Sequence, residues 1–225
     1  MTLKKSKDKL QPTARAAEIV REYGPFAGAD RVAGVTHDGK RVWAATGDKL
    51  IAFDPASGTP TQTLDHACDA GTAFDGKYLY QIAEQRIDKI NPSSGKVVAS
   101  IKAPGHGNDS GLAWAEGSLW VGQHRDRKIH QIDPATGALI RTIESNRFVT
   151  GVTWVDGELW HGTWEGDESE IRRINPESGA VLERLEMPRG VGVSGLESDG
   201  ADLFYCGGGN SATVRAVRRP KAASA

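Results

Sequence analysis

Several histidines and acidic residues lie where they could carry out acid–base chemistry. His66 and His106 fall in connections between predicted strands, and His124 ends a predicted strand. A neutral imidazole near pH 7 can accept or release a proton, and a nearby carboxylate can orient it or tune its pKa. Together with Glu84, these histidines are the candidate catalytic residues: His124, His106, His66 and Glu84.

Asp69 and Asp109 occupy matching positions, each two residues before a glycine. Two neighbouring carboxylates either share a proton or hold a hard cation such as Mg²⁺ or Ca²⁺. Asp69 and Asp109 are therefore candidates either for a shared proton or for a divalent cation site. The chain has no Cys-x-x-Cys or His-x-x-x-His spacing, so zinc is not indicated.

Other polar and aromatic side chains are expected to contact a ligand beside these groups. Polar residues of this kind have an alternative role, which is to bond loop backbones and internal water. For His161, within a predicted strand, the alternative is burial between sheets. The candidate binding residues are Arg31, Asn108, Gln123, Arg125, Phe148, His161 and Trp164.

These residues are distributed over a repeat of about 40 residues. A turn of the form Asx-Pro-x-Ser/Thr-Gly begins at Asp54, Asn91, Asp133 and Asn175, with spacings of 37, 42 and 42 residues. The Asx side chain bonds the backbone two residues on, Pro sets φ at the next position, and Gly supplies a positive φ. A repeat of this length built from hairpins is typical of β-propeller blades.

Five copies of a four-stranded unit can be placed along the chain. Each opens with a strand that carries glycine and continues with a strand built on an aromatic residue. We predict an all-β fold, a five-bladed β-propeller of four-stranded antiparallel blades. The last copy lacks a fourth strand, and residues 17–23 alternate correctly to supply it and close the ring. The opening glycines are Gly34, Gly71, Gly111, Gly151 and Gly195.

The propeller is predicted to be a single domain over residues 18–218, with a partly disordered N-terminal tail at 1–17 and a C-terminal tail at 219–225. The short Asp-Gly-type and Asx-Pro turns fall on one face of the ring, which we call the regular face. The other connections are irregular and form the irregular face. Binding residues usually lie on such loops, so the function is predicted there.

The composition of the chain limits the classes of binding partner that we expect. The net charge of −1 gives no reason to expect a nucleic acid or an anionic membrane. No apolar run suits a secretory leader or a membrane helix, and two cysteines make no disulfide framework. We expect a cytoplasmic protein whose partner is a small-molecule substrate or ligand. The sequence does not indicate an oligomeric state.

The chain resembles the bacterial and plant type of glutaminyl cyclase over residues 18–217. The likeness rests on residues 19–23 leading into 32–35, on 152–160 and on 194–196. It implies a five-bladed propeller that cyclises N-terminal glutamine. Where those cyclases commonly carry Gln or Glu, just before the inner glycine, this chain has Ala33, Ala70, Ser110, Thr150 and Ser194.

Residues 119–124 and 128–133 are similar to the blade pattern of streptogramin (virginiamycin B) lyases. Those enzymes are cytoplasmic, depend on a metal, and eliminate across an ester with a histidine base. The resemblance implies that His124 is the base and that Asp69 and Asp109 hold the cation.

Three functions stay open at this point. The first is a small-molecule enzyme of lyase or hydrolase type that uses histidine and carboxylate groups, with or without a metal. The second is a remote relative of the glutaminyl cyclases. The third is a non-catalytic propeller that binds a ligand or protein through Arg125, Phe148, Trp154 and Trp164.

Overall fold

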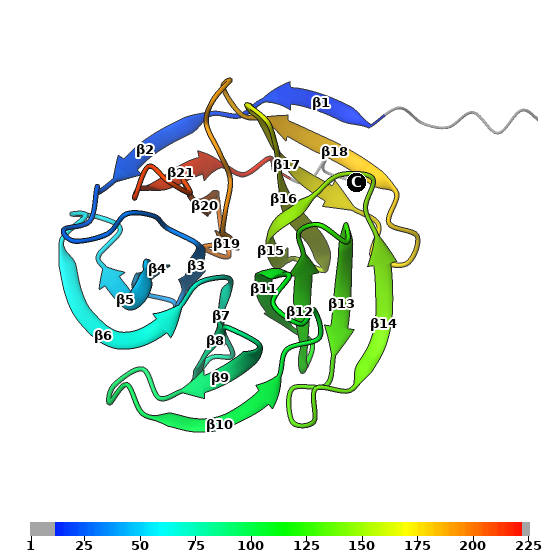
Figure 1. Cartoon of the computed structure of the whole chain (residues 1–225). Helices are drawn as coiled ribbons and strands as arrows, with labels where there is room; N and C mark the ends of the chain where they lie inside the picture. Colours follow the sequence, from blue (N-terminus) through cyan, green and yellow to red (C-terminus); the bar gives the residue numbers. More distant parts are fainter. Residues whose placement is uncertain (1–11, 222–225) are drawn as a thin grey trace, which may run out of the picture.

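The computed structural model describes residues 12–221 and shows five β-sheets arranged around a central axis (Figure 1). The chain circles this axis once, from blue at β3 to red at β21 (Figure 1). The prediction of a five-bladed, all-β propeller is confirmed. Within residues 12–221, no helix is long and apolar enough to cross a membrane.

The blades follow one another along the chain, each with its first strand innermost. Blade one has β3 (Gly34–His37), β4 (Val42–Ala45), β5 (Gly47–Phe53) and β6 (Pro60–Cys68). Blade two has β7 (Thr72–Phe74), β8 (Leu79–Ala83), β9 (Arg86–Ile90) and β10 (Val97–Lys102). Blade three has β11 (Asp109–Ala115), β12 (Ser118–Gln123), β13 (Lys128–Ile132) and β14 (Leu139–Glu144). Blade four has β15 (Val149–Val155), β16 (Glu158–Glu165), β17 (Glu168–Ile174) and β18 (Val181–Glu186). Blade five has β19 (Leu196–Ser198), β20 (Leu203–Gly207), β21 (Val214–Arg218) and β2 (Ile19–Tyr23).

The inner strands meet around the axis through their glycines. A Cβ built on Gly111 would lie 2.4 Å from the carbonyl oxygen of Thr150, in the next blade. At Gly71 the corresponding distance, to the backbone nitrogen of Leu112, is also 2.4 Å. Any larger side chain would collide with backbone here, which explains the glycine that opens each repeat.

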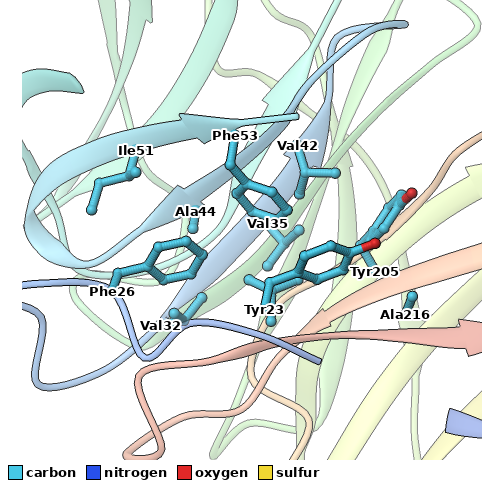
Figure 2. Close-up of a cluster of buried hydrophobic side chains, with 11 residues drawn as sticks. Tyr23, Phe26, Val32, Val35, Val42, Ala44, Ile51, Phe53, Tyr205 and Ala216 are labelled. Carbon is cyan, nitrogen blue, oxygen red and sulfur yellow. The ribbon is translucent and has the colours of Figure 1, made fainter. Parts of the chain in front are cut away.

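The N-terminal strand β2 closes the ring as predicted. It pairs antiparallel with β21, with Tyr23 opposite Val214. The Tyr23 ring packs 4.8 Å from that of Phe53, and Phe53 lies 5.3 Å from Phe26 (Figure 2). The Tyr23 hydroxyl donates a hydrogen bond to the Pro55 carbonyl at 2.9 Å. Strand β2 therefore ties the last blade to the first.

A further strand, β1 (Thr13–Ala16), lies in the segment that the sequence assigned to the N-terminal tail. It pairs in parallel with β18 and gives blade four a fifth strand. All four of its residues are exposed, so β1 covers an edge without adding to the core. The predicted C-terminal tail begins with Arg219, which is buried and forms an ion pair with Asp156 instead of lying free. Residues 1–11 and 222–225 of the predicted tails lie outside the described residues.

The Asx-Pro turns form as their sequence predicts. The Asp54 carboxylate accepts a hydrogen bond from the Ala56 N–H at 2.9 Å, and the Gly58 N–H donates to the Asp54 carbonyl at 2.7 Å.

Aromatic residues of the second strands fill the space between blades. The rings of Trp120 in blade three and Trp154 in blade four stack 5.4 Å apart. Local turn chemistry thus sets the hairpins, and aromatic packing joins the blades.

Candidate functional site: the cleft at the mouth of the channel

A cleft of about 400 Å³ opens where the inner strands begin, on the irregular face. We call it the mouth cleft. Every blade contributes to it, because the residue before each inner glycine lines it. Those residues are Ala33, Ala70, Ser110, Thr150 and Ser194. The other lining residues are Arg31, Val32, Asp69, Asp109, His124, Trp164, Gly209 and Asn210.

Asp109 is the buried carboxyl of this cleft, with 9% of its surface exposed. Both of its oxygens accept the Gly105 N–H, at 2.9 and 3.0 Å, and the Gln123 side chain also hydrogen-bonds to it. Burial raises the pKa of Asp109 above its usual range, although these hydrogen bonds and the charge of His106 oppose the rise. A Cβ on Gly105 would lie 2.6 Å from the carboxylate, so only glycine permits this contact.

Asp69 lines the same cleft but is exposed. Its carboxylate accepts the backbone N–H of Glu84 at 3.0 Å. The Glu84 side chain instead pairs with Arg86 at 2.9 Å in an exposed position outside the cleft lining. Within residues 12–221, no group of three or more His, Cys, Asp or Glu side chains is placed to hold a metal ion. This finding does not support the cation predicted at Asp69 and Asp109, which stays a prediction.

His124 follows β12 and lines the mouth cleft. Its ring lies 4.7 Å from the Phe148 ring, on the neighbouring blade. Burial, and after it the charge of Arg125, lowers the pKa of His124 below its usual range. The imidazole is therefore neutral at pH 7 and can accept a proton or a hydrogen bond.

Trp164 forms an aromatic wall of the cleft. It lies near the end of β16, and its indole N–H donates to the Gly166 carbonyl at 3.0 Å. The ring packs against two glycines of blade five, so that a Cβ on Gly192 would lie 2.8 Å from the indole. A Cβ on Gly209 would come even closer. These two glycines make room for the indole beside the cleft.

The other predicted binding residues divide between the cleft and its surroundings. The Arg31 side chain lines the cleft and has no carboxylate partner in the described part of the chain. Gln123 is the cross-strand partner of Asp109 and hydrogen-bonds to its carboxylate. The Asn108 carbonyl accepts the His124 backbone N–H at 3.1 Å. Arg125 is exposed, with no hydrogen bond or ion pair within residues 12–221.

Three histidines singled out in the sequence lie outside the lining of the mouth cleft. The side chain of His66 is mostly buried, with its Nε2 3.2 Å from Asp88 Oδ2. His106 is exposed in the loop before β11, at a φ of 50°. His161 is fully buried in β16 and lines a different cleft. Of the four candidate catalytic residues, the structure places only His124 in the cleft lining.

Ser194 is a cleft residue to which the sequence analysis gave no role. Its hydroxyl bonds the Val32 carbonyl and accepts the Gly209 N–H, the latter at 3.0 Å. It thereby joins the 207–211 loop to the first blade and shapes one side of the cleft. Its position just before an inner glycine was the available signal, since all five such residues share the cleft.

A scan against protein-family models and a search of curated proteins found no match. Among solved structures, the chain is similar to Myxococcus xanthus glutaminyl cyclase, with a TM-score of 0.76, 17% identity, and coverage of 92% of this chain and 98% of that one. A chain of the mitotic checkpoint complex matches with a TM-score of 0.53, 15% identity, and coverage of 84% and 75%. At these identities the likeness shows the fold alone. The likeness to streptogramin lyases stays a prediction. The chain is thus a five-bladed propeller with the architecture of that glutaminyl cyclase.

Proposed function

We propose that the protein is an enzyme that acts on a small molecule in the mouth cleft by acid–base chemistry of the lyase or hydrolase type. The observation that supports this is Asp109, a buried carboxyl in a cleft to which all five blades contribute. A carboxyl whose pKa is raised toward neutrality exchanges protons more readily at physiological pH. The neutral imidazole of His124 supplies a second proton acceptor in the same lining.

The lining also suggests the kind of substrate. The Trp164 indole offers a flat apolar surface, and the Arg31 guanidinium pairs with no carboxylate among residues 12–221. The hydroxyls of Ser110 and Ser194 are already engaged with backbone carbonyls. A small molecule with a flat apolar part and an acidic or strongly polar group matches this arrangement. In this proposal the protein works in the cytoplasm.

The test starts from a thermal-shift screen of small esters, amides and hydroxy acids, followed by turnover assays on the compounds that bind. Asp109→Asn should still bind those compounds but lose turnover by about 100-fold or more. Glu177→Gln, an exposed carboxyl-to-amide change on the regular face, is the matched control and should leave turnover unchanged. Turnover by Asp109→Asn at the wild-type rate would contradict the proposal. Binding without turnover in the wild type would favour the non-catalytic alternative.

A second candidate is cyclisation of N-terminal glutamine, favoured by the likeness to the Myxococcus enzyme over nearly the whole chain. In that reaction the α-amino nitrogen attacks the side-chain amide carbon and ammonia leaves. Asp109 would take the proton from the attacking amine and pass it to the leaving amide nitrogen, because the residues before the inner glycines include no acid. Release of ammonia from a peptide that begins with glutamine tests this candidate, and the absence of release excludes it.

A further inference from the structure

A second cleft, separate from the mouth, lies between blades three and four. Its volume is about 470 Å³. Glu144, Ser145 and Asn146, which follow one another at the end of β14, form one side. The turn between β17 and β18 forms the other side, with Val181 in its lining. His161 is also part of the lining and is fully buried.

The alternation of side chains along β16 directs His161 toward this cleft. Gly162 faces blade five, because a Cβ there would lie 2.6 Å from the Val193 side chain. Trp164 faces the same way and packs on Gly192. Successive residues of a strand point to opposite faces, so His161 faces blade three. This is the side on which the second cleft opens.

The hydrogen bonding of His161 leaves one ring nitrogen as a free acceptor. Its Nδ1 lies 3.0 Å from the Gly162 carbonyl oxygen. A carbonyl oxygen only accepts, so Nδ1 carries the hydrogen, and Nε2 keeps a lone pair. Burial lowers the pKa of His161 to about 4, which keeps the ring neutral. Nε2 is buried and has no hydrogen-bond partner within the described residues. A buried acceptor of this kind calls for a donor.

The surroundings select the type of donor. Arg172 is the cross-strand partner of His161, and its charge disfavours a second positive charge beside the ring. Glu170, bonded to Arg172 at 2.5 Å, opposes this effect on the ring. A neutral hydroxyl suits the uncharged acceptor beside this ion pair. The Asn146 side-chain oxygen already accepts from Arg172 at 2.7 Å, so its amide hydrogens remain to donate.

The rest of the lining suits a molecule with several hydroxyls. The Ser145 oxygen accepts the Arg147 N–H at 3.2 Å, which leaves its own hydrogen to donate. The exposed Glu144 carboxylate at the rim can only accept. Ile174 and Val181 add aliphatic surface. Alternating donors and acceptors beside an aliphatic surface match a ring with hydroxyls on its edge and C–H groups on its face.

We propose that this cleft between blades three and four binds a neutral polyhydroxy compound of monosaccharide size, with one hydroxyl donating to His161 Nε2. The site does not depend on the function proposed for the mouth cleft. It uses none of the residues that line that cleft.

Long-range ¹H–¹⁵N spectra of the full chain test the proposal directly. The protein is titrated with glucose, galactose, mannose and myo-inositol, and the His161 signals are assigned through the variant His161→Gln. At least one compound should shift the Nε2 resonance of His161 in a saturable way. The ring of His130, whose Nδ1 bonds Thr142 on the outer part of blade three, should not respond.

A variant at the exposed rim keeps the test independent of the buried core. Asn146→Ala should weaken binding at least fivefold, whereas the matched variant Asn108→Ala beside the mouth should not change it. A shift that Asn146→Ala leaves unchanged would overturn the proposal. So would a His161 signal that none of the four compounds moves, which would mean that internal water alone satisfies Nε2.

Discussion

At the scale of single residues, the inner wall of the ring holds a carboxyl that the mouth cleft does not use. Glu197 lies on β19, and its oxygens accept the hydroxyl hydrogens of Thr36 at 3.0 Å and Thr153 at 2.5 Å. These partners belong to blades one and four, so the side chain bridges both neighbours of blade five. Burial raises the pKa of Glu197 to about 7, although its three hydrogen bonds oppose the rise.

This raised pKa predicts a stability that depends on pH. The unfolded chain releases the Glu197 proton near pH 4.5 and the folded chain near pH 7, so the folded state binds more protons between these values. The free energy of unfolding therefore falls as pH rises through this window, by at most about 3 kcal/mol. Glu197→Gln removes this loss. In urea unfolding, it should match the wild type near pH 4.5 and be the more stable protein at pH 8.

Glu177→Gln serves as the control for that comparison, because the Glu177 side chain is exposed in an Asx-Pro turn. Its stability should follow that of the wild type at every pH. If the difference between Glu197→Gln and the wild type stays constant from pH 4.5 to 8, Glu197 does not titrate in this window.

At the scale of elements, strand alternation gives each face of β16 a different neighbour. One face directs Trp164 toward the loops of blade five, and the opposite face directs His161 toward blade three. A single strand therefore supplies one side chain to each of two clefts. The indole reaches its position only because Gly192 and Gly209 leave space for it.

The contact between Trp164 and Gly192 can be tested by a double-mutant cycle. Gly192→Ala places a Cβ against the indole and should destabilise the protein by about 1–3 kcal/mol. In the Trp164→Ala background the same change meets no ring and should cost much less. Chemical denaturation of the four proteins measures the coupling. Equal costs in the two backgrounds would show that Trp164 does not pack on Gly192.

At the scale of the whole molecule, the two N-terminal strands contribute unequally to the closure of the ring. Strand β2 completes blade five and buries Tyr23 between the last and the first blades (Figure 2). Arg21 adds a hydrogen bond of 2.6 Å to the Ala56 carbonyl of blade one. Strand β1 is exposed throughout; besides its backbone pairing with β18, it makes one ion pair within the described residues, from Arg15 to Glu183 at 2.7 Å. Closure of the ring therefore depends on β2.

Two truncations separate these contributions. Removal of residues 1–16 deletes β1 and should lower the melting temperature by only a few degrees, since little apolar surface is lost. Removal of residues 1–23 also deletes β2, opens the ring and exposes the edge of β21, so cooperative melting should be lost. Circular dichroism measures the thermal unfolding of both truncated proteins. A cooperative transition in the shorter chain would show that the ring closes without β2.

The sequence by itself determined the blade count, the ring closure and the face that carries the mouth cleft. Asx-Pro turns and inner glycines obey local rules of φ and hydrogen bonding, so their spacing is enough to count blades. The cleft positions of Asp69, Asp109 and His124 followed in turn, because strand ends on one face must converge. Only the tertiary structure decided that His66 meets Asp88, that His161 faces a separate cleft, and that β1 joins blade four. These outcomes depend on which blade faces each side of a strand, and register and twist set that choice in three dimensions.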